Sequence, residues 1–232
     1  MKISIVIPVL NEKEYLQTAV ERAWESNPDE VIVVDGGSND GSRELLDDLD
    51  CRPVDSQPGR GVQLNAGAAI ATGEVVLFLH VDTYLATNGC EQIRDALGSN
   101  ANVSRGCFQQ TIDNKRYIYR LIEFGNSFRA SKMNLPYGDQ GLFFRRAFFE
   151  EIGKFPNVVF LEDYILSKNL RGASDPLLVL DGPLEVSARR WEHNGPLRQT
   201  FRNWWICLAH RFGSSPAELE KKHYTKKNTD DD

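Results

Sequence analysis

The sequence contains few cysteines, and none of them is close to another along the chain. The four cysteines form no Cys-x-x-Cys motif: Cys51, Cys90, Cys107 and Cys207. This spacing disfavours a zinc site or a disulfide scaffold, and we expect reduced thiols, as in a cytoplasmic protein. No apolar run approaches the roughly 20 residues that cross a bilayer, so we expect no transmembrane segment.

Three widespread nucleotide- and ester-processing motifs are also absent. The segment from Pro8 to Glu12 follows the first apolar run, where a dinucleotide-binding fold needs Gly-x-Gly-x-x-Gly. The chain has no Gly-x-x-x-x-Gly-Lys followed by Ser or Thr, and no Gly-x-Ser-x-Gly nucleophile elbow. Hydride transfer, P-loop ATP hydrolysis and esterase chemistry are therefore disfavoured.

Basic residues are in the minority. The 232 residues include 27 Lys and Arg against 33 Asp and Glu, which gives a net charge of -6. This balance argues against a broad nucleic-acid-binding surface and leaves room for a local basic pocket. Hydrophobic residues make up 41% of the chain, as is usual for a globular protein.

Apolar strands and amphipathic helices alternate in the first part of the chain. Strands are expected over 3–7, 31–34, 52–54 and 74–79, with helices over 16–24, 42–49 and about 60–71. This alternation predicts an α/β fold with a mostly parallel sheet between helices. The later pattern is mixed α+β, with helices over 91–97, 115–130 and 197–212 and strands over 103–111, 177–180 and 184–186. We expect one domain over 1–223, made of a first half (1–83), a second half (84–195) and C-terminal helices (196–223), followed by a flexible charged tail (224–232).

Acidic residues follow three of the expected strands. Glu12 comes after the first strand, Asp35 after the second and Asp82 after the fourth. Ligands of open α/β sheets bind at the carboxyl ends of the strands, which meet at one edge. Carboxylates gathered there repel one another unless a cation or hydrogen-bond donors neutralise them. The pattern therefore predicts a functional site, and a divalent metal that bridges to substrate phosphates would suit it.

Several motifs occur in a fixed order along the chain. They are Ile7-Pro8-Val9-Leu10-Asn11-Glu12, Val34-Asp35-Gly36-Gly37-Ser38, Asn65-Ala66-Gly67, Leu79-His80-Val81-Asp82-Thr83, Gly138-Asp139-Gln140-Gly141 and Leu161-Glu162-Asp163. Over about residues 1–195 this succession resembles the family 2 glycosyltransferases with the GT-A fold. The His-x-Asp-Thr motif and the segment 187–192 resemble a small soluble bacterial subgroup of that family. The resemblance implies a Rossmann-like nucleotide-binding half, an acceptor half, and transfer of a sugar from a nucleoside-diphosphate-sugar to an acceptor hydroxyl.

The resemblance also implies a set of donor-binding residues. They are Pro8, Asn11, Glu12, Asp35, Gly37, Arg60, Asn65, His80 and Asp82. Glu12 and Asp35 would accept hydrogen bonds from the ribose and the base. Asp82 matches the metal-binding acid of the family's Asp-x-Asp motif and would place Mg²⁺ or Mn²⁺ on the diphosphate. His80 replaces the first Asp and either contacts the donor or is a structural histidine, while His193 is a candidate further metal ligand.

A second group of matching residues lies later in the chain. Asp163 matches the catalytic base of inverting members, which must accept the proton of the acceptor hydroxyl, and Glu162 is its nearest rival. The alternative is that both acids only stabilise the start of a helix. The implied acceptor-binding residues are Asp139, Gln140, Arg189, Arg190 and Trp191. The two arginines and Arg60 are also candidate partners of the diphosphate.

The expected helix 197–212 combines aromatic and basic residues. It either touches a membrane surface or a lipid-linked acceptor, or packs against the domain or a homodimer partner. Its apolar spacing also suits packing, which is the interpretation we favour. Two other functions stay open for the chain as a whole. One is a non-catalytic nucleotide-sugar-binding or scaffold protein. The other is a nucleotidyltransferase, although the Gly-rich, Arg-containing loop expected after its first strand is missing.

Overall fold

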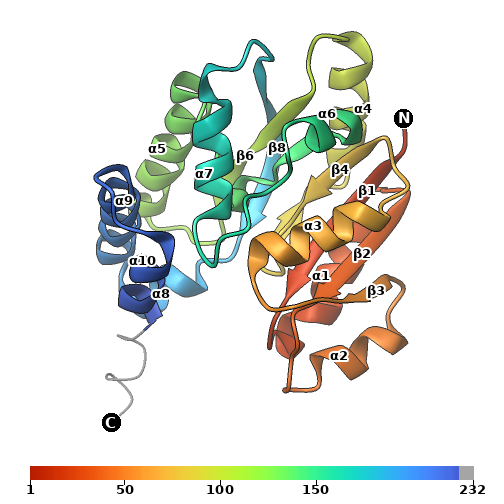
Figure 1. Cartoon of the computed structure of the whole chain (residues 1–232), viewed down its shortest axis with the longest axis horizontal. Coiled ribbons are helices and arrows are strands. Elements are labelled where there is room, and N and C mark those ends of the chain that lie inside the picture. The colour runs from red at the N-terminus through yellow and green to blue at the C-terminus, as the bar shows by residue number, and fades with distance from the viewer. Residues whose placement is uncertain (225–232) are drawn as a thin grey trace.

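An eight-stranded sheet runs through the computed structural model, which describes residues 1–224 (Figure 1). The strand order is β3-β2-β1-β4-β7-β6-β8-β5. The strands are β1 (Ile3–Val9), β2 (Glu30–Asp35), β3 (Arg52–Asp55), β4 (Val75–Phe78), β5 (Thr83–Leu85), β6 (Arg105–Ile112), β7 (Phe143–Arg145) and β8 (Leu177–Val186). Strands β1 to β4 are parallel to one another, β6 is parallel to β8, and β7 and β5 are antiparallel to the strands they join. The predicted α/β class with a mostly parallel sheet is confirmed.

Helices cover both faces of this sheet. They are α1 (Lys13–Glu25), α2 (Ser42–Leu45), α3 (Arg60–Ile70), α4 (Gly89–Ser99), α5 (Tyr117–Met133), α6 (Arg146–Glu151), α7 (Glu162–Asn169), α8 (Arg189–Asn194), α9 (Pro196–Arg211) and α10 (Pro216–Tyr224). Helices α1 and α4 pack on one face, and α3, α6 and α7 on the other. No helix in the described part of the chain is long and apolar enough to cross a bilayer.

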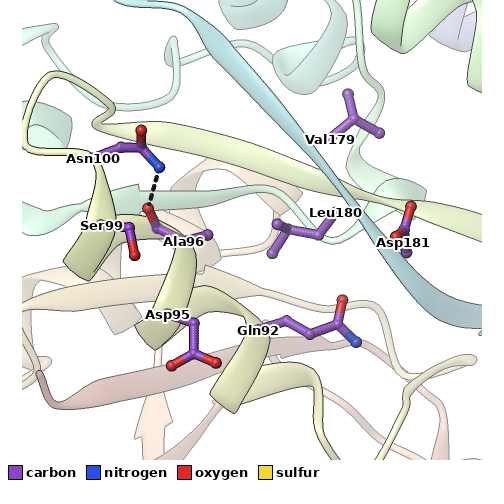
Figure 2. Close-up of a pocket in the computed structure, with 8 residues that line it drawn as sticks. All are labelled: Gln92, Asp95, Ala96, Ser99, Asn100, Val179, Leu180 and Asp181. Carbon is purple, nitrogen blue, oxygen red and sulfur yellow. Dashed lines mark hydrogen bonds between the residues drawn. The ribbon is translucent and has the colours of Figure 1, made fainter.

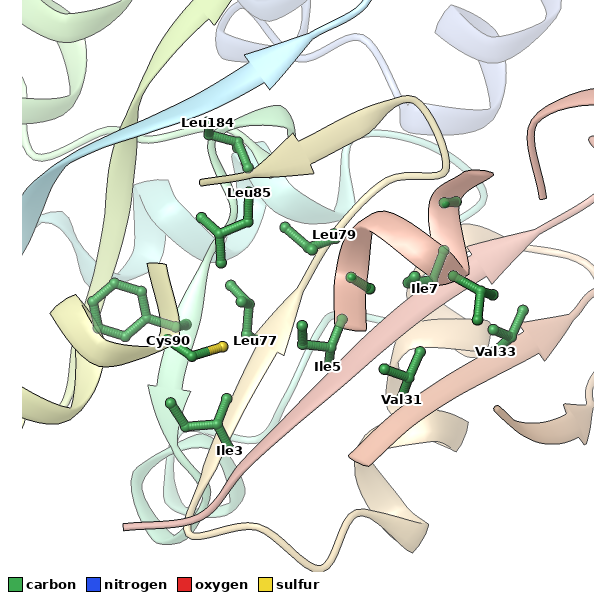
Figure 3. Packing of buried hydrophobic residues seen from close by; sticks show 14 of the residues in the cluster. Ile3, Ile5, Ile7, Val31, Val33, Leu77, Leu79, Leu85, Cys90 and Leu184 are labelled. Carbon is green, nitrogen blue, oxygen red and sulfur yellow. The ribbon is translucent and has the colours of Figure 1, made fainter. Parts of the chain in front are cut away.

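The apolar strands pack on both sides, which explains their nearly continuous hydrophobic sequence. Ile3, Ile5 and Ile7 of β1 point into the cluster beneath α1 and α4, where Figure 3 shows them beside residues of β2 and β4. Val6, between them in sequence, points into the opposite cluster beneath α3. Gly67 allows that helix to approach closely, because a Cβ atom there would lie 2.4 Å from Cγ1 of Val6.

The structure differs from the predicted elements in several places. The expected helix 42–49 is the short helix α2 followed by a 3₁₀ turn over Leu46–Asp48. The two expected strands at 177–180 and 184–186 form one strand, β8, whose pairing with β6 is irregular between Phe108 and Gln110. The elements β5, β7, α6 and α8 had no prediction, whereas α10 falls within the expected C-terminal helices. Apart from Tyr224 at the end of α10, the predicted tail lies outside the described residues.

Candidate active site

The carboxyl ends of β1, β2 and β4 form one rim of the sheet, as the parallel pairing requires. Val9 at the end of β1 is in register with Asp35 at the end of β2. Chain segments that follow β1 and β2 are tied together: the Asn11 N–H donates to Ser38 Oγ (2.8 Å), and Asn11 Oδ1 accepts the Asn39 N–H (2.8 Å). Asn11 adopts a left-handed backbone with φ 56°, a conformation that Asn tolerates better than most residues. The two loops therefore form one wall of the rim.

Asp35 is buried at this rim, and one of its two carboxylate oxygens is available to accept a hydrogen bond from a ligand. Its Oδ2 accepts the backbone N–H groups of Gly37 (2.8 Å) and Ser38 (2.9 Å). Its Oδ1 is buried and has no hydrogen-bond partner among the described residues. Because an unsatisfied buried acceptor costs free energy, Oδ1 is suited to a donor supplied by a ligand.

Pairing between β5 and β8 brings a distant segment to the same rim. Thr83 is in register with Val186, and the Ser187 N–H donates to the Asp82 carbonyl oxygen at 3.0 Å. Helix α8 starts two residues later, at Arg189. The strand pairing thus places the first side chains of α8 beside Asp82.

The guanidinium of Arg189 joins two of the acids at the rim. Its Nη1 and Nη2 donate to the Glu12 carboxylate at 3.0 and 3.2 Å, and its Nε donates to Asp82 Oδ2 at 3.0 Å. The guanidinium also lies over the Tyr15 ring, 4.3 Å from its centroid. Burial alone would raise the pKa of Asp82, but the positive charges of Arg190 and Arg189 outweigh it and hold that pKa below its ordinary value. Asp82 is therefore an ionised carboxylate held by arginine.

His80 adds no positive charge to this cluster. Burial, followed by the positive charge of Arg60, lowers the pKa of His80 to about 3, so the imidazole is neutral at physiological pH. The backbone of His80 is fixed by Thr83, whose Oγ1 accepts the His80 N–H and whose hydroxyl donates to the His80 carbonyl, both at 2.9 Å.

Asp163 meets His80 across Gly138. Asp163 Oδ2 accepts the Gly138 N–H at 2.6 Å. A Cβ atom added to Gly138 would lie 2.9 Å from that oxygen and 3.1 Å from His80 Nε2. The absence of a side chain at Gly138 therefore lets the side chains of Asp163 and His80 come close to each other. Asp163 lies in the first turn of α7, which follows Leu161 in a left-handed conformation at φ 67°. A non-glycine residue in this region is uncommon and strained, as is often found near functional sites.

Two further acids near Asp163 are held in environments that favour protonation. The Glu162 side chain is only 3% exposed and lies 3.5 Å from Arg60 Nη1. Burial raises the pKa of Glu162 above its ordinary value in spite of Arg60. Burial likewise raises the pKa of Asp139, whose Oδ1 has no hydrogen-bond partner in the described part of the chain. Gln140 next to it accepts hydrogen bonds from Arg129 (3.1 Å) and from a backbone N–H.

The sequence profile of Glycosyl transferase family 2 matches residues 4–153, which include the ends of β1, β2 and β4 and the segment around Gly138. The chain belongs to glycosyl transferase family 2. Among curated proteins it is 28% identical over 173 residues to the glycosyltransferase AglE of Haloferax volcanii, an alignment that covers 67% of this chain and 56% of that protein. It is 38% identical over 91 residues to an uncharacterized glycosyltransferase of Nostoc sp., alr2836, covering 35% of this chain and 28% of that one.

Solved structures of glycosyltransferases share the fold of this family 2 chain. The S. aureus protein TarS, in complex with UDP-GlcNAc, superposes with a TM-score of 0.65 at 18% identity over 81% of this chain and 58% of that one. The mannosyltransferase PcManGT of Pyrobaculum calidifontis, in complex with GDP-Man and Mn²⁺, gives a TM-score of 0.64 at 20% identity over 96% and 69% of the two chains. These likenesses establish the predicted GT-A fold for the chain.

The residues of the family 2 site do not fit a metal ion held by the protein alone. Oδ2 of Asp82 is already bonded to Arg189, and Arg190 Nε lies 4.0 Å from the same oxygen. His193, the predicted additional ligand, is exposed and lies within hydrogen-bond distance of the neighbouring Asn194 side chain. Among residues 1–224 no group of three or more His, Cys, Asp or Glu side chains is arranged to hold a metal.

Two other residues predicted to bind a ligand, Asn65 and Trp191, make contacts within the fold. The Asn65 side-chain amide makes hydrogen bonds in both directions with the Phe155 backbone, at 2.9 and 3.1 Å. Trp191 is buried, and its ring packs edge-on against Tyr119 with 6.4 Å between the centroids. Both residues position the segments around the site. Their role toward a ligand stays a prediction.

Sequence reasoning missed three side chains that shape the site. Gln63 of α3 is buried and donates to the carbonyls of Val9 (2.7 Å) and Val34 (2.9 Å), so it joins the ends of β1 and β2. The other two are Tyr15 and Arg129, which support Arg189 and Gln140. The one available signal was a long polar residue on the otherwise small and apolar face of α3.

Two concave regions lie elsewhere on the surface. An open groove between α4 and β8, shown in Figure 2, is lined by none of the rim residues. A small cavity between α5 and α9 contains Tyr137, Asp139, Trp191 and Trp204 in its lining and so adjoins the acidic segment around Asp139. The second region is the one next to the candidate active site.

Proposed function

We propose that the chain transfers a glycosyl group from a nucleoside-diphosphate-sugar to an acceptor hydroxyl, with inversion at the anomeric carbon. The observation that carries this proposal is the approach of Asp163 to His80 across Gly138, at the end of the strand that leads to Asp82. A carboxylate and a charged cluster are thereby adjacent, and a direct displacement requires a proton acceptor close to a group that binds the diphosphate. The curated relatives named above exceed this chain in length, since it spans 28% to 56% of them.

The nucleoside would bind against the wall formed by the ends of β1 and β2. Asp35 supports this placement, because its buried Oδ1 lacks a partner in residues 1–224 and would accept a hydrogen bond from a base or ribose group. Glu12 lies on the same wall and is engaged by Arg189. Two fold neighbours have structures in complex with nucleotide-sugars, TarS with UDP-GlcNAc and PcManGT with GDP-Man. They do not identify the base or sugar for this chain.

Arginines would stabilise the departing nucleoside diphosphate. Arg189 and Arg190 stand beside Asp82, and Arg60 begins α3 at the same end of the sheet. Guanidinium groups suit phosphate oxygens because they donate in a planar fork and stay charged at every physiological pH. Phosphate would compete with the Glu12 and Asp82 carboxylates for Arg189 when the donor binds. Mg²⁺ or Mn²⁺ assistance stays a prediction, in which Asp82 would hold the ion once Arg189 has moved.

Asp163 is the proposed base. Its carboxylate is partly exposed and is oriented by the Gly138 and Tyr164 N–H groups, at 2.6 and 2.7 Å, which leaves lone pairs for the proton of an acceptor hydroxyl. The rival Glu162 is buried against Arg60 and has less access to an incoming hydroxyl. Transfer would join the acceptor oxygen to the anomeric carbon, break the bond from that carbon to the diphosphate oxygen, and leave the proton on Asp163.

A donor screen tests this proposal. Purified protein would be titrated with UDP-, GDP- and dTDP-sugars, each with Mn²⁺, Mg²⁺ or EDTA, while slow donor hydrolysis is followed. One donor should bind, and Asp163→Asn should lower turnover by at least about 100-fold with donor affinity retained. Glu162→Gln is the matched control and should keep most of the turnover.

Other outcomes of the screen separate the alternatives. A folded and fully active Asp163→Asn variant would show that the base is misassigned. A chain that binds a donor but never cleaves it, with any acceptor offered, would support the non-catalytic binding protein instead.

A further inference from the structure

Two neighbouring helices expose an unusual amount of apolar surface. On α5 the exposed apolar side chains recur at intervals of three and four residues, and on α9 they do the same, so each set forms a single stripe. The nine residues, which we call the α5–α9 apolar face, are Tyr117, Leu121, Phe124, Phe128, Leu197, Phe201, Trp204, Trp205 and Leu208, with exposed fractions between 51% and 89%. Folded monomers rarely leave a large apolar patch in water, so this face indicates a partner.

The face points away from the body of the protein. The buried residues of α5 (Tyr119, Ile122, Arg129 and Ala130) lie on the opposite side of that helix from the exposed stripe. The buried residues of α9 (Gln199 and Ile206) are likewise opposite its stripe. The two helices lie side by side at the edge of the molecule away from β1, β2 and β3 (Figure 1), and both line the small cavity next to Asp139. The favoured expectation for 197–212 is packing against the domain or a homodimer partner, and packing against the domain accounts only for the inner side of α9.

The charge around this face has the opposite sign to the charge of the chain. Helices α5 and α9 contain six basic residues and one acidic residue, Glu123, which is paired with Arg120. The whole chain has a net charge of -6. The exposed basic side chains on or beside the face are Lys115, Arg116, Arg120, Lys132, Arg198 and Arg211. This surface is therefore complementary to a negatively charged, apolar partner.

We propose that the α5–α9 apolar face docks the chain on the surface of an anionic lipid bilayer. Aromatic and leucine side chains would enter the boundary between headgroups and acyl chains, while the arginines and lysines contact acidic headgroups, as in interfacial amphipathic helices. A second copy of the chain fits less well, because a two-fold dimer through this face sets the same basic surface against itself. Since Trp204 belongs to both the face and the cavity, docking brings the Asp139 end of the site to the bilayer. The proposal does not depend on the transfer reaction.

Vesicle co-sedimentation of the full chain is the decisive experiment. The chain should bind vesicles that contain phosphatidylglycerol and bind phosphatidylcholine vesicles weakly or not at all. The double substitution Phe124→Ser with Phe201→Ser should weaken binding by about tenfold or more, because each ring loses its burial in lipid. Val159→Ser, at another exposed apolar side chain (52% exposed), is the matched control and should leave binding unchanged. Arg198→Gln with Arg211→Gln should weaken binding to anionic vesicles, and added salt should do the same.

A second measurement uses the unmodified chain and so does not depend on whether the variants fold. Two of the four tryptophans, Trp204 and Trp205, lie on the face. Their fluorescence should shift to shorter wavelength on addition of anionic vesicles and be quenched by brominated acyl chains. Absence of both vesicle binding and a fluorescence change would overturn the proposal. So would a lipid-free dimer that Phe124→Ser with Phe201→Ser dissociates, since the face would then belong to a second copy.

Discussion

Arg189 Nε donates a 3.0 Å hydrogen bond to Oδ2 of Asp82, which is 107 positions earlier in the chain. The same guanidinium holds Glu12, so one cation neutralises two carboxylates at the end of the sheet. A divalent cation or a phosphate group that enters this site must compete with an internal ion pair. The strength of that competition is measurable.

Removal of the Arg189 charge should make the site a better cation site. Arg189→Gln leaves Glu12 and Asp82 without their shared partner, and Mn²⁺ in the absence of donor should bind at least about tenfold more tightly than to the unmodified chain. Isothermal titration calorimetry with Mn²⁺ alone measures this change. Arg190→Gln is the control, because Arg190 is 4.0 Å from Asp82 and more exposed, and its effect should be smaller. An unchanged Mn²⁺ affinity in folded Arg189→Gln would contradict the competition.

Asp35 should contribute to nucleotide binding far more than its neighbour in the sheet. Asp35→Asn replaces a carboxylate, which only accepts hydrogen bonds, with an amide that presents a donor on one side. We expect nucleotide affinity to fall by about tenfold or more. Asp55→Asn is the matched control, since Asp55 is in register with Asp35 on β3 but has an exposed side chain paired with Arg43. Calorimetric titration with the donor found in the screen would show equal losses if Asp35 had no special role.

Glu162 should make stability depend on pH in an unusual direction. Burial raises its pKa in the folded state above the unfolded value, so the folded protein binds the proton more readily. Stability is therefore lost as pH rises from the unfolded pKa, near 4.5, through the folded pKa, and the loss persists above it. Glu162→Gln removes this penalty. Its stability relative to the unmodified chain should increase with pH over that range in urea unfolding.

Glu30 provides a control of opposite sign. Burial would raise its pKa, but hydrogen bonds from Ser4 and Thr72 outweigh that effect and lower it. Glu30 thus stabilises the fold above its unfolded pKa, and this contribution is lost as pH falls through the folded pKa. Glu30→Gln should destabilise the chain at neutral pH. If Glu30→Gln and Glu162→Gln showed the same pH trend, the burial argument for Glu162 would be wrong.

One part of the site could be predicted from the local sequence, namely from where each apolar run ends. A buried parallel strand ends where its apolar run ends, and the next polar residue lies at the ligand-binding edge. This reasoning placed Asp35 and Asp82 at one rim from their positions after two runs. The unpredicted part depends on pairing between distant segments. Arg189 reaches Asp82 because β5 pairs with β8, and neither the three-residue β5 nor its register has a signal in the residue spacing.

Contacts between distant segments also explain why the role of Gln63 on α3 and the exposure of the aromatic residues on α9 could not be predicted from the sequence. Gln63 looks like an ordinary polar residue in sequence, and only the assembled sheet shows that its amide joins the ends of β1 and β2. The aromatic residues of the segment 197–212 have a helical spacing that fits burial and exposure equally well. The direction of the stripe is decided by the contacts of Ile206 on the inner side of α9 with other parts of the fold.

Close packing of α3 on the sheet gives the last test. A Cβ atom at Gly67 would lie 2.4 Å from Val6 Cγ1 and 2.9 Å from Val34 Cγ2, so Gly67→Ala forces α3 away from β1 and β2. The clash exceeds the roughly 1 kcal/mol that alanine gains over glycine in a helix, and we expect a net destabilisation of about 1 to 2 kcal/mol. Gly98→Ala in α4 meets no atom within 4 Å and should be neutral or stabilising by up to about 1 kcal/mol. Urea unfolding of both variants measures the difference, and equal stabilities would show that α3 is not held by close contact. Because α3 also carries Gln63 and Arg60, Gly67→Ala should weaken donor binding as well, whereas Gly98→Ala should not.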